Sequence, residues 1–258
     1  MTVPTARPGV SIGAGRVLGT REGNIDRFLA IPYAAPPFGE RRFAPPAPPE
    51  ECEGERDASA FGPTAPQTAY GGGIENHLGS VEIAGDDILT VNVWTPADRE
   101  AGHPLPVLVF VHGGALSRGT PALGAYDGAT FARHGIVYVS IAYRVGSEGF
   151  SVLDDAPLNL GLLDQIAALD WVRREIGAFG GDPHDVTAMG HSAGGNTLAA
   201  LLAHPRCNGK VGAIGYCFGG TTVGMFAVRR PDLAAAVPFY GGHPAAADVA
   251  RIKAPMMI

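Results

Sequence analysis

Cysteine is scarce in this chain: Cys52, Cys207 and Cys217 are the only three among 258 residues. A small, odd set does not make a disulfide framework, so we expect a reducing compartment and a cytoplasmic location. The sequence also lacks any run of Lys or Arg, and its net charge is −6. We therefore expect neither a nucleic acid nor an anionic membrane as a partner. With no 18-residue apolar stretch and no apolar segment in residues 1–9, a transmembrane helix and a signal peptide are not expected.

Motifs for metals and organic cofactors are missing as well. The chain contains no H-x-x-E-H, no C-x-x-C and no phosphate-binding loop, so the sequence implies no metal and no cofactor. Apolar residues make up 46% of the chain and charged residues 17%, a balance opposite to that of disordered proteins. We expect a folded protein with a single domain over residues 1–258.

The apolar pattern predicts an α/β fold. Residues 107–111 (VLVFV) and 136–142 (IVYVSIA) are continuous apolar runs, which are typical of strands buried on both faces. Residues 89–94 alternate as a strand, and residues 159–178 have helical spacing. This alternation favours a mostly parallel sheet with helices on both faces.

Residues 32–66 contain nine prolines, which exclude a helix or a central strand there. We expect an extended surface loop. A flexible linker is the alternative, but aromatic residues embedded in the segment, such as Tyr33 and Phe61, speak against it.

A candidate nucleophile lies at residues 190–194 (GHSAG), between a predicted strand at 186–189 and a predicted helix at 197–203. Strand, G-x-S-x-G and helix in this order form a nucleophile elbow, which raises the hydroxyl of Ser192 at the sheet edge. A glycine-rich packing turn is the alternative interpretation. The glycine-rich turn at residues 112–114 (HGG) follows the strand at 107–111. Its backbone N–H groups are candidates for stabilising an oxyanion, whereas His112 precedes the nucleophile and is expected to support the turn.

An internal repeat follows at an offset of 25 residues. Residues 186–203 and 211–228 share six identities, and both copies predict strand, sharp turn and helix. The second copy carries Cys217 at the elbow position, in residues 215–219 (GYCFG). A thiolate at a helix N-terminus is activated, but a small buried cysteine at a turn fits equally well, and both interpretations stay open.

Residues from about 10 to 205 resemble the N-terminal part of type B carboxylesterases. The stretches that carry the resemblance are residues 28–34 (FLAIPYA), 87–96 (DILTVNVWTP), 109–114 (VFVHGG), 126–128 (YDG), 159–165 (NLGLLDQ), 171–172 (WV), 179–183 (FGGDP) and 190–195 (GHSAGG). The resemblance implies an α/β-hydrolase fold, a serine esterase and an oxyanion hole made by Gly113, Gly114 and Ala193. One departure is His191, where the family commonly has Glu.

Residues from about 209 to 258 resemble the middle of dienelactone hydrolases, which have the same fold and a cysteine nucleophile. The matching stretches are residues 209–220 (GKVGAIGYCFGG), 234–241 (AAAVPFYG) and 252–255 (IKAP). The resemblance makes Cys217 a possible second nucleophile. Together the two resemblances indicate a splice of two hydrolases, with 1–205 carboxylesterase-like and 206–258 dienelactone-hydrolase-like, truncated at the C-terminus.

The base and the acid of a catalytic triad cannot be carried over from either family to a position in this chain. In both families they lie well downstream of the elbow, and only 66 residues follow Ser192. Of the two histidines in that stretch, His204 ends the elbow helix, while His243 follows a predicted strand at 237–240. We take His243 as the candidate base and Asp248 as the candidate acid. The alternative is that His243 is only a loop residue.

From these residues we expect a serine carboxylesterase that hydrolyses small, uncharged esters through an acyl-enzyme on Ser192. Its partner is then a small-molecule ester, and its oligomeric state stays open. Two alternatives remain: a catalytically silent hydrolase fold, either an interaction module or a truncated or chimeric chain, and a thiol hydrolase of lactones acting through Cys217.

Overall fold

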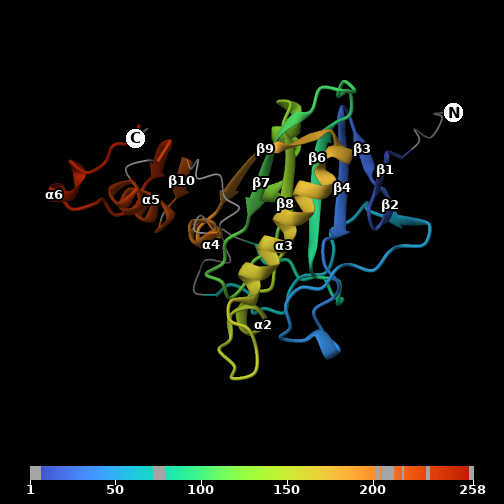
Figure 1. Ribbon diagram of the computed structural model, residues 1–258, viewed down its shortest axis with the longest axis horizontal. Coiled ribbons are helices and arrows are strands. Elements are labelled where there is room, and N and C mark those ends of the chain that lie inside the picture. Colours follow the sequence, from blue (N-terminus) through green and yellow to red (C-terminus); the bar gives the residue numbers. More distant parts are fainter. Residues whose placement is uncertain are drawn as a thin grey trace. The chain divides into compact units, whose positions relative to one another are not determined.

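The computed structural model describes residues 7–71, 79–201, 204, 212–216, 218–230 and 233–255. The chain forms two compact units, one of residues 1–109 with 117–187 and one of 110–116 with 188–258. From Leu105 onward, strands alternate with helices along the chain (Figure 1), which confirms the predicted α/β class. Within the described residues, every helix is too short or too polar to span a lipid bilayer.

The first unit is built on a sheet of six strands in the order β3-β4-β6-β8-β7-β9. Their bounds are β3 (Thr20–Glu22), β4 (Ile25–Pro32), β6 (Thr90–Pro96), β8 (Val137–Ile141), β7 (Leu105–Val111) and β9 (Gly181–Gly190). The last residues of β7 and β9 belong to the second unit. A small sheet, β1-β2-β5, is formed by β1 (Gly9–Ile12), β2 (Gly15–Leu18) and β5 (Glu55–Asp57). Beyond Pro32, the last residue of β4, the proline-rich segment contributes a 3-10 turn at Gly39–Arg41 and a three-residue edge strand, β5, in agreement with its composition.

The large sheet is mixed. The pairs β3–β4, β4–β6 and β6–β8 are antiparallel, although the sequence predicted a mostly parallel sheet. Glu22 pairs with Ile25 across a two-residue turn, and such a hairpin makes its strands antiparallel. All residues of β6 and β8 are buried. A continuous apolar run thus predicts burial on both faces of the sheet, but it does not predict whether neighbouring strands are parallel or antiparallel.

Aromatic side chains show that both faces of the sheet are covered. On one face, the rings of Phe28 and Trp171 lie 5.2 and 5.9 Å from that of Phe179. On the other face, Trp94 and Phe131 lie 5.6 and 5.0 Å from Tyr138. Since Phe28 pairs with the neighbour of Trp94, the two sets point to opposite sides of the sheet. The predicted helices on both faces are therefore present.

The helices of the first unit are α1 (Ala129–Arg133), α2 (Gly146–Phe150) and α3 (Leu160–Glu175), with 3-10 turns at Gly39–Arg41, Gly124–Tyr126 and Ile176–Phe179. Helix α3 confirms the helix predicted over residues 159–178. It begins after Asn159, whose left-handed backbone (φ 58°) marks the start, and it tightens into a 3-10 turn at Ile176.

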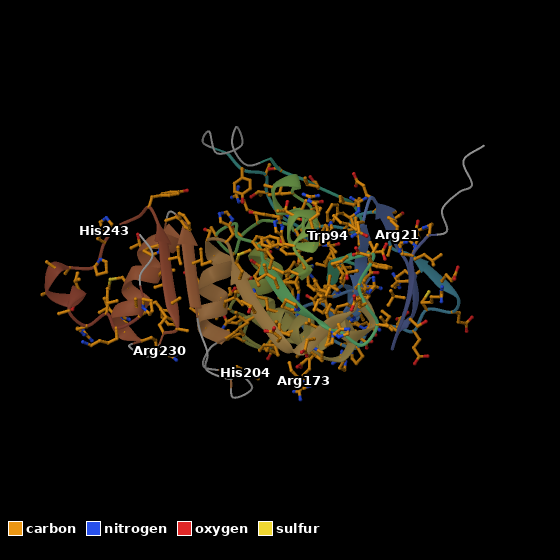
Figure 2. All side chains as sticks on the ribbon, turned by 90° about the horizontal axis from the view of Figure 1, so that it is seen from above. Arg21, Trp94, Arg173, His204, Arg230 and His243 are labelled. Atoms are coloured by element: carbon orange, nitrogen blue, oxygen red, sulfur yellow. The ribbon has the colours of Figure 1, made fainter. Side chains whose placement is uncertain are left out.

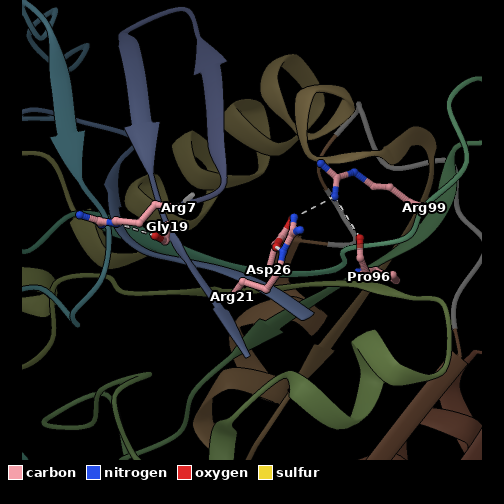
Figure 3. Close-up of polar contacts among 6 residues, drawn as sticks. All are labelled: Arg7, Gly19, Arg21, Asp26, Pro96 and Arg99. Atoms are coloured by element: carbon pink, nitrogen blue, oxygen red, sulfur yellow. Dashed lines mark hydrogen bonds and ion pairs between the residues drawn. The ribbon is translucent and has the colours of Figure 1, made fainter. Parts of the chain in front are cut away.

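Two ionic clusters hold distant segments of this unit together. Asp26 on β4 is 2% exposed and lies 2.5 Å from Arg21 Nε, while Arg99 Nη1 lies 3.4 Å from it and donates to the carbonyl of Pro96 (Figure 3). The second cluster is fully buried. There, the guanidinium of Arg144 donates to both carboxylate oxygens of Asp164, at 2.7 and 2.8 Å.

The second unit contains α4 (Ala193–Leu201), β10 (Gly212–Tyr216), α5 (Phe218–Arg229), β11 (Ala235–Phe239) and α6 (Ala246–Val249). Strands β10 and β11 pair in parallel in a two-stranded sheet. Their core is formed by the buried residues Val223, Ala227, Leu233, Ala236 and Ala254. The internal repeat is therefore structural: β9–α4 and β10–α5 are both strand, turn and helix.

Candidate active site

Ser192 occupies the turn between β9 and α4. Its φ is 53°, in the left-handed region that a residue with a Cβ rarely adopts. Strand β9 ends at Gly190, one residue beyond the predicted strand at 186–189, and α4 begins at Ala193, four residues earlier than the sequence suggested. A serine held in a strained turn between strand and helix has the geometry of a nucleophile elbow. The carbonyl of Ser192 accepts from the amide of Gly195 at 2.9 Å, which closes the first turn of α4.

The elbow packs directly on the end of β7. The amide of His191 donates to the carbonyl of Val111 at 3.0 Å. A Cβ on Gly194 would lie 2.3 Å from that same carbonyl oxygen, so no other residue fits there without a shift. Glycine at this position lets the helix approach the strand, and it explains why the motif needs a small residue two positions after the serine.

The glycine turn at residues 112–114 lies against the elbow. A Cβ on Gly113 would lie 2.6 Å from the carbonyl oxygen of His191 and 2.9 Å from the Cβ of Ser192. The turn continues in left-handed backbone at Gly114 (φ 118°), Ala115 (φ 56°) and Leu116 (φ 61°). The structure thus brings Gly113 next to Ser192, as the oxyanion-hole prediction requires.

Ala193 supplies a backbone N–H at the same place. It is the first residue of α4, so no helical carbonyl precedes it to accept its hydrogen. The positive end of the helix also favours negative charge near this amide. These features suit an oxyanion that forms on a carbonyl attacked by Ser192.

His112 supports the glycine turn from inside. Its side chain is buried, and Nδ1 lies 2.8 Å from the carbonyl oxygen of Gly113. Because a carbonyl only accepts, Nδ1 carries the hydrogen in this contact. The pKa of His112 is lowered to about 4, mainly by burial and to a smaller extent by the nearby His191, against the opposing effect of the hydrogen bond to Gly113. His112 is therefore neutral at pH 7.

In the sequence, His191 stands out only as a departure from the family pattern. The structure places its imidazole at the glycine turn. The Nδ1 atom lies 3.3 Å from the position that a Cβ on Gly113 would take. Burial lowers the pKa of this imidazole. No sequence signal gave this contact, since the two residues belong to different strand ends.

His243 and Asp248 lie in the loop after β11 and in α6. His243 is exposed, and Figure 2 shows it on the loop that leads to α6. Asp248 forms an ion pair with Arg251 at 3.3 Å, one helical turn away. Among the described residues, no hydrogen bond joins His243 to Ser192 or to Asp248. Their roles as base and acid stay predictions.

Cys217 lies outside the described residues, and its role as a second nucleophile stays a prediction. A Cβ on Gly220 of α5 would lie 2.2 Å from the carbonyl oxygen of Tyr240, directly after β11. Helix α5 thus approaches the end of β11 as closely as α4 approaches the end of β7. Within the described part of the chain, no group of three or more His, Cys, Asp or Glu side chains is arranged to hold a metal ion.

Comparison with known proteins gives a consistent result. The profile of the Carboxylesterase family matches residues 6–232. Para-nitrobenzyl esterase of Bacillus subtilis is 44% identical over 200 residues, which are 76% of this chain and 40% of that protein. Human carboxylesterase 3 is 41% identical over 217 residues, 79% of this chain and 38% of that protein.

The solved structure of a PNB esterase superposes with a TM-score of 0.70 at 38% identity, covering 87% of this chain and 48% of that one. This similarity confirms the predicted α/β-hydrolase fold. The chain spans less than half the length of these relatives. The profile also runs through residues 209–232, beyond the predicted junction, and the resemblance of residues 209–258 to dienelactone hydrolases stays a prediction.

Proposed function

The chain belongs to the carboxylesterase family, and from this premise we propose that it hydrolyses small, uncharged carboxylic esters with Ser192 as its nucleophile. One observation carries the proposal: Ser192 stands in a left-handed elbow, and a Cβ added to Gly113 of the glycine turn would lie 2.9 Å from the Ser192 Cβ. Nucleophile and oxyanion donors therefore meet at one point, which acyl transfer requires.

The reaction proceeds in two stages. The hydroxyl oxygen of Ser192 adds to the ester carbonyl, its proton passes to a base, and the carbonyl oxygen becomes an oxyanion beside Gly113, Gly114 and Ala193. Collapse of this intermediate expels the alcohol and leaves an acyl-serine. Water then releases the acid and restores the hydroxyl. His243, with Asp248, is the base that we propose within this chain.

An alkyl fluorophosphonate tests the nucleophile. We expect covalent labelling of the chain at Ser192 and none of the Ser192→Ala variant. Ser117 is a suitable matched control, since it lies in the loop after the glycine turn, and Ser117→Ala is expected to label like the parent chain. Labelling that persists in Ser192→Ala contradicts the assignment.

Turnover of p-nitrophenyl butyrate distinguishes an active esterase from a silent hydrolase fold. In a serine protease, loss of the triad base costs about 10⁶ in kcat and leaves roughly 10³–10⁴ over water from the oxyanion hole and binding. Because His243 is exposed and no hydrogen bond joins it to Ser192 in the described residues, we expect turnover slower than that of an enzyme with an assembled triad but above that residual level. Turnover at the spontaneous rate identifies a silent fold.

The alternative function, a thiol hydrolase of lactones acting through Cys217, is supported by the second elbow motif alone. Labelling of Cys217 by a thiol-reactive lactone probe tests it. The cytoplasmic location likewise rests on the sparse cysteines, and small uncharged esters are proposed as the only partners.

A further inference from the structure

His191 lies at the centre of the contacts that join the elbow to the glycine turn. Its amide donates to Val111 at 3.0 Å, and its carbonyl accepts from the amide of Gly194 at 2.9 Å. Both backbone groups are therefore fixed, one by the end of β7 and one by α4. Fixed backbone limits the directions open to the imidazole.

The imidazole faces the turn that holds the oxyanion donors. Its Nδ1 atom is 3.3 Å from the Cβ position of Gly113, so one edge of the ring lies against that glycine. The titratable group that faces His191 from this turn, within the described residues, is His112. Because His112 is buried and neutral at pH 7, it brings no charge of its own to the turn.

We propose that His191 controls the charge at the oxyanion turn: its imidazole takes up a proton when an anion forms beside Gly113, Gly114 and Ala193. The inference rests on the proposed function, since that anion arises when Ser192 attacks an ester. His191 acts through the turn and is a positioning residue. A Glu at this position, common in the family, places negative charge where the histidine can become positive.

The direction of the effect follows from electrostatics. Burial lowers the pKa of His191, so the ring is neutral at pH 7 in the free protein. An opposite charge within about 4–6 Å raises an imidazole pKa by roughly 1–3 units. Between the free and the raised pKa, formation of the anion is therefore coupled to uptake of one proton by His191.

Phenylboronic acid provides a stable form of this anion. The oxygen of Ser192 donates an electron pair to boron, its hydroxyl proton leaves, and a tetrahedral boronate anion results. The proton of Ser192 goes to its base or to solvent in both chains. Because His191 of the parent chain takes up one further proton as the anion forms, the affinity of the parent chain rises about tenfold less per pH unit than that of His191→Gln, between the free and the raised pKa of His191.

The experiment measures histidine titrations by NMR in the full chain, free and with phenylboronic acid, together with the affinity between pH 5 and 8. We expect the pKa of His191 to rise by at least about one unit in the adduct. We expect the titration of the exposed His103 to stay unchanged, and His103→Gln to bind like the parent chain. Ser192→Ala is expected to form no adduct.

Three outcomes overturn the inference, and they are distinguishable. An adduct that leaves the titration of His191 unmoved overturns it while the proposed function stands. A shift at another histidine instead identifies that residue as the proton acceptor. Absence of any Ser192-dependent adduct overturns the proposed function and this inference with it. The titration in the parent chain does not depend on whether His191→Gln folds.

Discussion

Gly113 and Ser192 are 79 positions apart in the sequence, yet a Cβ on Gly113 would lie only 2.9 Å from the Cβ of Ser192. The same Cβ would meet the carbonyl of His191 at 2.6 Å. The contact leaves no room for a side chain. The position of the glycine turn relative to the nucleophile therefore depends on a single missing methyl group.

Gly113→Ala is expected to displace the turn and weaken the oxyanion hole. Loss of one oxyanion donor reduces kcat by about 10²–10³ in a serine protease, so we expect fluorophosphonate labelling of Ser192 to slow about 100-fold. The measurement is the second-order labelling rate. Gly124→Ala, where a Cβ meets nothing within 4 Å, is the control. Equal labelling rates in both variants contradict a role for Gly113.

Ser192→Gly is expected to abolish labelling and to stabilise the chain. The φ of 53° is strained for any residue with a Cβ, by about 1 kcal/mol or more, and glycine removes that strain. Chemical denaturation compares the free energy of unfolding of Ser192→Gly with that of Ser192→Ala, which also lacks the hydroxyl. We expect the glycine variant to be more stable by ~1 kcal/mol. Equal stability shows that the elbow is not strained.

His112 is expected to destabilise the chain in acid. Its folded pKa of about 4 lies below the usual value of 6.5, so folding is favoured by neutral imidazole. That contribution is complete above pH 6.5 and is lost as the pH falls from 6.5 to 4. The shift corresponds to roughly 3 kcal/mol. In His112→Gln we expect a flatter dependence of unfolding free energy on pH across this window, and an unchanged slope contradicts the buried neutral state.

His243→Ala tests the proposed base. If His243 accepts the proton of Ser192, kcat/KM for p-nitrophenyl butyrate falls at least ~100-fold, the low end of general-base contributions. The pH profile of kcat/KM changes as well, because the group that accepts the proton is lost. The kinetic pH profile is measured in the parent chain and in His204→Ala as the control. An unchanged rate and profile assigns His243 to the loop and leaves catalysis to Ser192 and the oxyanion turn.

Asp164→Ala is expected to destabilise the first unit strongly, because it leaves the guanidinium of Arg144 buried without its carboxylate. Breaking a buried ion pair costs about 3–5 kcal/mol, whereas replacing both partners by apolar residues is often nearly neutral. Denaturation of Asp164→Ala is therefore compared with the double variant Arg144→Met, Asp164→Leu. We expect the single variant to be the less stable of the two, and the reverse order contradicts an ionised pair.

The sequence by itself determined the local parts of this protein. The apolar runs at residues 107–111 and 136–142 became β7 and β8, and residues 159–178 became α3 with its 3-10 extension. Ser192 was found because an elbow is a short motif whose glycines and serine are adjacent in the chain. Whether a segment forms a strand, a helix or a turn depends on residues within a few positions of it, so these elements can be predicted from the sequence.

Only the tertiary structure decided which of these strands, helices and turns contact one another. The antiparallel pairing of β4 and β6, the approach of Gly113 to Ser192 and the imidazole of His191 at the glycine turn join segments with no shared local signal. The ion pair of Asp248 with Arg251, three positions on, is a local contact, and the role of Asp248 beside His243 stays a prediction. Contacts between distant segments depend on the packing of whole strands and helices, and no short pattern of residues encodes that packing.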